Sequence, residues 1–122
     1  MMNPVIWFEV PVTNIDRAKK FYRDVFGYEY QMLEMGPLQI AVIEGDMNAH
    51  GATGGLIKGE DYVPSKTGTY IYFSCDDVNI ELEKIEKAGG KVLVPKTSIG
   101  ESGFIAHFID SEGNRVGLHS DK

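Results

Sequence analysis

The sequence contains almost no cysteine and no long hydrophobic run. Cys75 is the only cysteine among 122 residues. An internal disulfide needs two thiols and a Cys-based zinc site needs several, so both are excluded. We expect Cys75 to be a small buried strand residue rather than a nucleophile. No apolar run approaches the ~20 residues of a membrane span, and residues 1–10 lack the features of a signal peptide. We therefore expect a cytoplasmic protein without membrane contact.

Basic residues are also scarce. Lys and Arg number 12 against 18 Asp and Glu, which gives a net charge of −6. Binding to a phosphate backbone needs a basic patch, so nucleic acid is not an expected partner. The apolar fraction of 43% and charged fraction of 25% are typical of a globular protein. The length suits one domain, which we place at residues 1–122.

The spacing of apolar residues in the first half of the chain changes several times between patterns typical of strands and of helices. Residues 4–12 are rich in β-branched and aromatic residues, which predicts a strand. Residues 13–27 then carry apolar side chains at helical spacing, with Thr13 or Asn14 as a cap and Gly27 as a stop. Further extended segments are predicted at residues 28–33, 38–44 and 52–58.

The second half repeats this order. A strand is predicted at 69–75, a helix at 76–90, and strands at 91–95, 104–110 and 116–120. Each half therefore has the order βαβββ, with module one at about 4–60 and module two at about 68–120. A half of this size hides little apolar surface alone, so the halves should share one interior. The predicted fold class is α+β.

Three segments of the chain carry a resemblance to a known family. They are "FEVPVTNIDRAKKFYRDVFGYEY", "DDVNIELEKIEKAGGKV" and "FIDSEGNRVGLH". Together they resemble the vicinal oxygen chelate superfamily, which includes glyoxalase I, extradiol dioxygenases, and fosfomycin and bleomycin resistance proteins. The chain looks most like a group of predicted enzymes related to lactoylglutathione lyase. The resemblance implies a mixed sheet curled around a cavity, but fold alone does not assign a function.

The resemblance also implies a metal site that this sequence does not match. Metal-dependent family members hold one divalent ion with His, Glu or Gln from the first and last strands of each half. The matching positions here are Trp7, Gly54 or Gly55, Tyr70 and Gly117. Indole offers only an N–H donor and glycine has no side chain, so at least three of four ligands are missing. We expect no metal cofactor at the usual site.

The alternation of side chains along the predicted strands selects the candidate site. It puts Trp7 and Glu9 on one face, and Tyr70 and Tyr72 on the cavity face of the second half. The histidines of the last two strands should also face the cavity. The candidate ligand-binding residues are Trp7, Glu9, Tyr70, Tyr72, His107 and His119, of which Glu9, Tyr70 and His107 are the candidate catalytic residues.

Each of these residues also has a purely structural interpretation. Glu9 can be paired with an arginine or solvated, and the histidines can be hydrogen-bonded sheet or dimer-interface residues. The aromatic residues can pack, or form a wall on which a ligand stacks. His50, in the segment "GDMNAHGATGG", is expected to be solvated and part of a mobile loop.

Three functions are compatible with this site. The first is a metal-free protein that binds a small apolar or aromatic molecule. The second is a lyase or isomerase of glyoxalase type, with Glu9 as base and a Tyr or His as acid. The third is a metal-dependent enzyme with a shifted site made of Glu9, His107 and His119. We also expect a homodimer, because residues 7–12 and 117–120 leave edge strands and apolar surface to cover.

Overall fold

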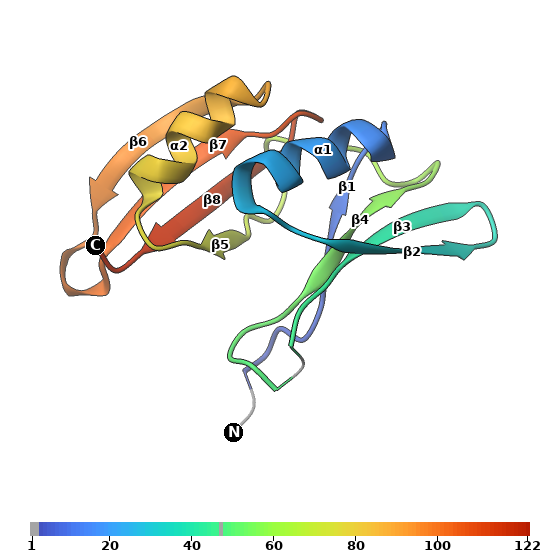
Figure 1. The fold of residues 1–122 in the computed structure, drawn as a ribbon, viewed down its shortest axis with the longest axis horizontal. Helices are drawn as coiled ribbons and strands as arrows, with labels where there is room; N and C mark the ends of the chain where they lie inside the picture. The colour runs from blue at the N-terminus through green and yellow to red at the C-terminus, as the bar shows by residue number, and fades with distance from the viewer. Residues whose placement is uncertain (1–2, 47) are drawn as a thin grey trace.

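The structure, a computed structural model, describes residues 3–46 and 48–122 and confirms the repeated order (Figure 1). The first module contains β1 (Phe8–Pro11), α1 (Ile15–Phe26), β2 (Tyr30–Met35), β3 (Leu38–Ile43) and β4 (Gly54–Lys58). The second module contains β5 (Tyr72–Ser74), α2 (Val78–Lys87), β6 (Lys91–Ser98), a short 3-10 helix (Gly100–Ser102), β7 (Phe104–Ile109) and β8 (Arg115–Ser120). The predicted α+β class is confirmed.

The strands form two separate four-stranded sheets. Their orders are β1-β4-β3-β2 and β5-β8-β7-β6, with β1 parallel to β4 and β5 parallel to β8. Each module thus leaves its first strand at a sheet edge. The expectation that residues 117–120 form an edge is wrong, because β8 lies between β5 and β7. The strands β1 and β5 are shorter than predicted, since each pairs with only one neighbour over 4 and 3 residues.

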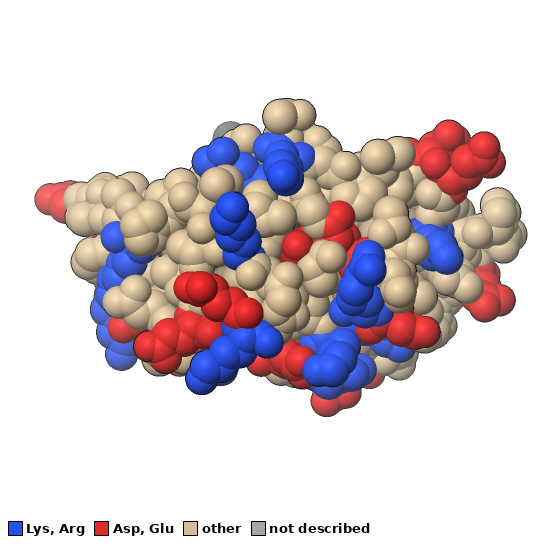
Figure 2. Space-filling model, turned by 90° about the horizontal axis from the view of Figure 1, so that it is seen from above, with Lys and Arg blue, Asp and Glu red and all other residues tan. Residues whose placement is uncertain are grey.

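The helices lie on the same side of the two sheets in Figure 1. Asn14 caps α1 by accepting a hydrogen bond from the Arg17 amide at 3.0 Å, and Gly27 ends the helix with φ 77°. Asp77 caps α2. Positive and negative side chains intermingle on this side of the molecule (Figure 2), as expected for the solvated face of amphipathic helices. In the described residues no helix is long and apolar enough to cross a membrane.

The modules share one aromatic core beneath the helices. Phe26 of α1 lies 5.2 Å from Phe73 of β5 between ring centroids, and Phe21 lies 6.1 Å from Phe108 of β7. Phe8 of β1 also contacts Phe73, at 5.6 Å. These contacts cross from one module to the other, so neither sheet completes its core alone. The core-facing side of each sheet is therefore largely filled by these contacts, and we call the opposite side, which carries Gly55 in the first module and Gly117 in the second, the open face.

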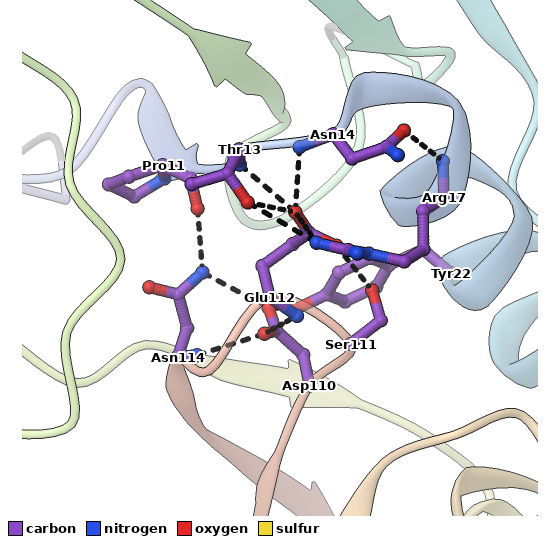
Figure 3. A network of polar contacts seen from close by, with 9 residues as sticks. All are labelled: Pro11, Thr13, Asn14, Arg17, Tyr22, Asp110, Ser111, Glu112 and Asn114. Atoms are coloured by element: carbon purple, nitrogen blue, oxygen red, sulfur yellow. Dashed lines mark hydrogen bonds and ion pairs between the residues drawn. The ribbon is translucent and has the colours of Figure 1, made fainter. Parts of the chain in front are cut away.

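The turn between β7 and β8 joins the modules through a buried carboxylate (Figure 3). The Glu112 side chain accepts hydrogen bonds from the amides of Thr13 and Asn14 at 2.9 and 2.8 Å, at the start of α1. The Arg17 guanidinium donates to it at 2.6 Å. Burial alone would raise the pKa of Glu112, but Arg17, the two amides and Ser111 together lower it to about 2. The carboxylate satisfies amides that the helix leaves unpaired.

A second carboxylate in this turn is buried more deeply. Asp110 is 3% exposed and accepts the hydroxyl of Tyr22 at 2.8 Å, from the first module. Asn114 donates to Asp110 and to the carbonyl of Pro11, at 3.1 and 2.7 Å. Desolvation raises the pKa of Asp110 against the effect of these hydrogen bonds. The segment 110–114 thus clamps the end of β1 and the start of α1 to the second module.

Candidate functional site

A row of three residues crosses the open face of the second module. Tyr72 of β5 pairs with Gly117 of β8, which pairs with His107 of β7. A Cβ atom at position 117 would overlap the Tyr72 ring, so the ring lies directly over the glycine. The Tyr72 hydroxyl thereby comes within 2.8 Å of His107 Nε2. The missing side chain of Gly117 is what lets the phenol reach across an intervening strand.

Arg115 and Tyr70 complete the cluster around His107. The Nε–H of Arg115 donates to His107 Nδ1 at 2.9 Å, and the guanidinium carbon lies 4.9 Å from the Tyr70 ring centroid. The Tyr70 ring meets the imidazole edge to face at 5.6 Å, and its hydroxyl donates to the carbonyl of Lys66. We call Tyr70, Tyr72, His107 and Arg115 the His107 cluster.

These contacts fix the protonation of His107. The residue is 6% exposed, and burial, followed by the charge of Arg115, lowers the pKa of its imidazole. A guanidinium is always protonated and can only donate, so Nδ1 must accept and the proton of the neutral ring sits on Nε2. Nε2–H then donates to the Tyr72 oxygen. The hydroxyl hydrogen of Tyr72 is therefore free to donate to another molecule.

The cluster still has two unused donor groups. Within the described chain, the Tyr72 hydroxyl has no acceptor, and no carboxylate lies within 4.0 Å of Arg115. Arg115 is partly exposed, and Tyr70 and Tyr72 are 38% and 49% exposed. The arrangement offers two aromatic surfaces beside a hydroxyl donor and a cation. It can bind a flat molecule that carries a hydrogen-bond acceptor.

Two cavities adjoin this cluster along the edge strands β1 and β5. The larger, of about 700 Å³, is lined by Phe8, Tyr28, Tyr70 and Tyr72 together with the β3–β4 connection. The smaller, of about 240 Å³, is lined by Arg115 and Glu9 among others. The cluster therefore lies beside enough space for a small organic molecule.

The other predicted site residues have hydrogen-bond partners outside the cluster, although Glu9 shares the smaller cavity with Arg115. The Trp7 indole donates to Glu9 at 3.3 Å, so these two share a face, but Glu9 is exposed and pairs with Gly55 in the first module. The His119 Nε2–H donates to the Ser102 carbonyl at 2.6 Å. This hydrogen bond favours the structural interpretation of His119 given above. His50 lines the larger cavity. Of the predicted residues, Tyr70, Tyr72 and His107 come together; their roles stay predictions.

Sequence reasoning missed Arg115. The predicted strand begins at residue 116, which left Arg115 in the preceding turn, whereas β8 begins at Arg115. Arg115 has the same parity as Gly117 and His119, so extending the strand by one residue would have placed it on the open face. An error of one residue at a strand boundary thus hid the only cation of the cluster.

The donor set does not fit the metal site of the family. Gly54 pairs with Phe8 on the core side, where a Cβ atom would overlap Phe8, so Gly55 is the open-face position. The space above Gly117 is filled by the Tyr72 ring. Among the described residues there is no group of three or more His, Cys, Asp or Glu that could hold a metal ion. The three residues of the shifted site considered above therefore do not converge either.

Comparison with known proteins defines the family. Residues 5–118 match the family model of the Glyoxalase/Bleomycin resistance protein/Dioxygenase superfamily. The chain belongs to this superfamily, which confirms the predicted membership of the vicinal oxygen chelate group. It is 32% identical over 112 residues to a glyoxylase-like domain-containing protein of Didymella fabae, covering 87% of this chain and 84% of that protein.

Solved structures show the same fold at lower identity. An E144Q mutant of glyoxalase I from Zea mays superposes with a TM-score of 0.76 at 22% identity, over 97% of this chain. This chain spans only 47% of the maize protein. The fosfomycin resistance protein FosX of Listeria monocytogenes gives a TM-score of 0.71 at 16% identity, covering 100% of this chain and 94% of that one. At these identities the likeness concerns the fold alone.

Proposed function

We propose that the open face of the second module binds a small aromatic or apolar molecule without a metal ion. The His107 cluster carries this proposal. A buried imidazole with both nitrogens engaged holds Tyr72 in place, while two tyrosine rings stay exposed beside it. Ligand sites are typically concave and aromatic, with a few fixed polar groups. The cluster and its adjoining cavities have this composition.

The proposed ligand packs its apolar body along Tyr70 and Tyr72. Its polar end accepts from the Tyr72 hydroxyl, which His107 keeps oriented outwards as a donor. The larger cavity then receives the remainder of the molecule. At least three of the four usual metal positions contribute no ligand atom, since an indole and two glycines occupy them.

A matched pair of glycine substitutions tests this proposal. Gly117→Ala forces the Tyr72 ring away from His107, whereas Gly55→Ala puts the same methyl group at the equivalent open-face position of the first module, 3.0 Å from Ile40 and the Ala41 carbonyl. Calorimetric titration with neutral probes such as 3-phenylpropan-1-ol should show at least about tenfold weaker binding only for Gly117→Ala. Far-UV circular dichroism checks folding. Equal affinities, or no binding by any probe, would contradict the proposal.

A glyoxalase-type lyase or isomerase is the second candidate. One observation favours it: Glu9 lines the same small cavity as Arg115, so an exposed carboxylate and a cation face one space. In this scheme Glu9 transfers the proton, with Tyr70 or His107 as the acid. Glu9→Gln should then abolish turnover while changing ligand affinity by less than about tenfold. Retained turnover in this variant would refute the assignment of Glu9.

We also propose that the protein is a cytoplasmic homodimer. The edge strand β2 exposes Met32, Leu33 and Met35 at 48%, 46% and 56%, and a second copy could cover these side chains. Light scattering at micromolar concentration should give the mass of a dimer, and Leu33→Lys should shift it towards the monomer. A monomeric wild-type protein would refute the assembly.

A further inference from the structure

We infer that the site selects a ligand with a single carboxylate at the Arg115 end and an apolar body in the larger cavity. This inference rests on the proposed function and adds the charge of the ligand to it. It follows from the donors that the His107 cluster leaves unused, from the distribution of charge around the two cavities, and from the position of Glu9.

The unused donors match a carboxylate. The Nε–H of Arg115 is committed to His107, which leaves the two terminal nitrogens of a guanidinium whose orientation is fixed by that bond and by the Tyr70 ring. Two terminal N–H groups can bind both oxygens of one carboxylate. The Tyr72 hydroxyl adds a donor, because the tautomer of His107 makes the phenol oxygen an acceptor from the imidazole. A neutral amide offers one acceptor oxygen and satisfies fewer of these donors.

The charges around the cavities favour one anionic group rather than two. Arg115 is the only Lys or Arg among the described residues that line either cavity. The lining of the larger cavity includes the carboxylates of Glu44 and Asp46. A second negative charge on the ligand would approach these carboxylates, whereas an apolar body would contact Phe8 and Tyr28. The geometry therefore suits an aryl or alkyl monocarboxylate.

Glu9 opposes this binding to a small extent. It lines the smaller cavity with Arg115, without an ion pair between them. A negative charge in the same cavity weakens the attraction of an incoming carboxylate, although its exposure screens the effect. Glu9→Gln should therefore tighten carboxylate binding about twofold. This direction is opposite to the one expected if Glu9 itself contacted the ligand as a hydrogen-bond acceptor.

Pairs of acids and amides of equal shape test the inference. Calorimetric titrations compare 3-phenylpropanoate with 3-phenylpropanamide, and the acids and amides one carbon shorter and longer. For the wild-type protein we expect each acid to bind about tenfold more tightly than its amide. Equal binding of acid and amide would overturn the inference and leave the proposed function intact. Absence of binding by every probe would overturn both.

Three variants test which residue causes the preference for the acid over the amide. Arg115→Gln should remove the tenfold preference while changing amide affinity less than about twofold, and Tyr72→Phe should reduce acid binding about threefold. Lys84→Gln removes the same charge from α2 and serves as the matched control. A preference that survives Arg115→Gln, or that disappears equally in Lys84→Gln, would overturn the assignment to Arg115.

Discussion

The two modules share one backbone plan but carry different side chains on their open faces. In the first module the row runs Glu9, Gly55, Val42; in the second it runs Tyr72, Gly117, His107. A glycine occupies the middle of both rows. Only the second row has an aromatic ring long enough to cross the glycine and a polar partner on the far strand. The same register therefore yields a hydrogen-bonded cluster in one module and none in the other.

This difference shows that the repeated backbone register sets the positions of the row, whereas the side chains at those positions differ between the modules. The Glu9 carboxylate accepts a hydrogen bond from the Trp7 indole, and the Val42 side chain has no hydrogen-bonding group. The first-module position that corresponds to Arg115, two residues before the central glycine, is Thr53, which carries no charge. The side-chain hydrogen bonds between strands of the row thus occur in the second module, where Tyr72, His107 and Arg115 meet.

The largest effect is expected from a substitution in segment 110–114, which clamps the two modules together. Asp110→Ala leaves the buried Tyr22 hydroxyl and the backbone N–H of Asn114 without their acceptor, and the Asn114 side-chain amide keeps only the Pro11 carbonyl. We expect a loss of about 3 kcal/mol in the free energy of unfolding, measured by urea denaturation. Ser111→Ala, which removes one hydroxyl bond to Glu112, is the control and should cost under about 1 kcal/mol. A loss below 1 kcal/mol for Asp110→Ala would contradict the clamp.

Exchanging the far-strand residues of the two rows separates their contributions to binding. His107→Val removes the partner of both Tyr72 and Arg115, so binding of 3-phenylpropanoate should weaken about tenfold, or ~1.4 kcal/mol. Val42→His places an imidazole in the first row, where no tyrosine faces it, and should leave affinity unchanged. Calorimetry on both variants decides the matter. A greater loss in Val42→His than in His107→Val would reverse the assignment of the site to the second module.

The protonation of His107 gives a smaller, pH-dependent effect. The group is surrounded by Arg115, Tyr70 and Tyr72, and burial lowers its pKa below the ordinary 6.5. The unfolded chain therefore binds a proton at His107 more readily than the folded protein does. The contribution of the neutral imidazole to the free energy of unfolding is complete above pH 6.5, and it is lost as the pH falls through the lowered pKa of the folded state. Urea unfolding between pH 7.5 and about 5 should show the loss. His107→Gln should have a flatter profile; an identical slope in both proteins would refute this origin.

The smallest expected signal is metal content. Neither row supplies a set of imidazole or carboxylate donors, so protein purified without an affinity tag should contain far less than one equivalent of transition metal by elemental analysis. Near-stoichiometric zinc, nickel, iron or manganese that is lost in His107 or His119 variants would refute this prediction. Such a result would favour a metal-dependent enzyme.

Local signals in the sequence predicted the helices well. Residues 13–27 carry a single apolar face, a cap at Asn14 and a stop at Gly27, and α1 spans Ile15–Phe26. These features act within one helix, so they need no knowledge of distant partners. The alternation that placed Tyr72 away from Phe73 is local in the same sense, and the resemblance to the family supplied the pairing of the modules.

The cluster itself depends on contacts that no local pattern encodes. The bond between Tyr72 and His107 requires β5, β8 and β7 in one register, with a glycine between the two side chains. The hydrogen bond between Glu112 and the Asn14 amide joins residues that lie 98 positions apart in the chain. Arg115 was lost to a strand boundary, which is the least reliable feature of sequence prediction. The contacts that the sequence did not predict are thus those that depend on how distant strands pair.

An NMR titration with 3-phenylpropanoate, followed through amide and imidazole chemical shifts, reports both the protonation of His107 and the place where the probe binds. We expect a neutral His107 protonated at Nε2, with saturable shift changes at Tyr72, His107 and Arg115 and none at Gly55 or Val42. Changes centred on Gly55 and Val42, or a His107 protonated at Nδ1, would contradict this expectation.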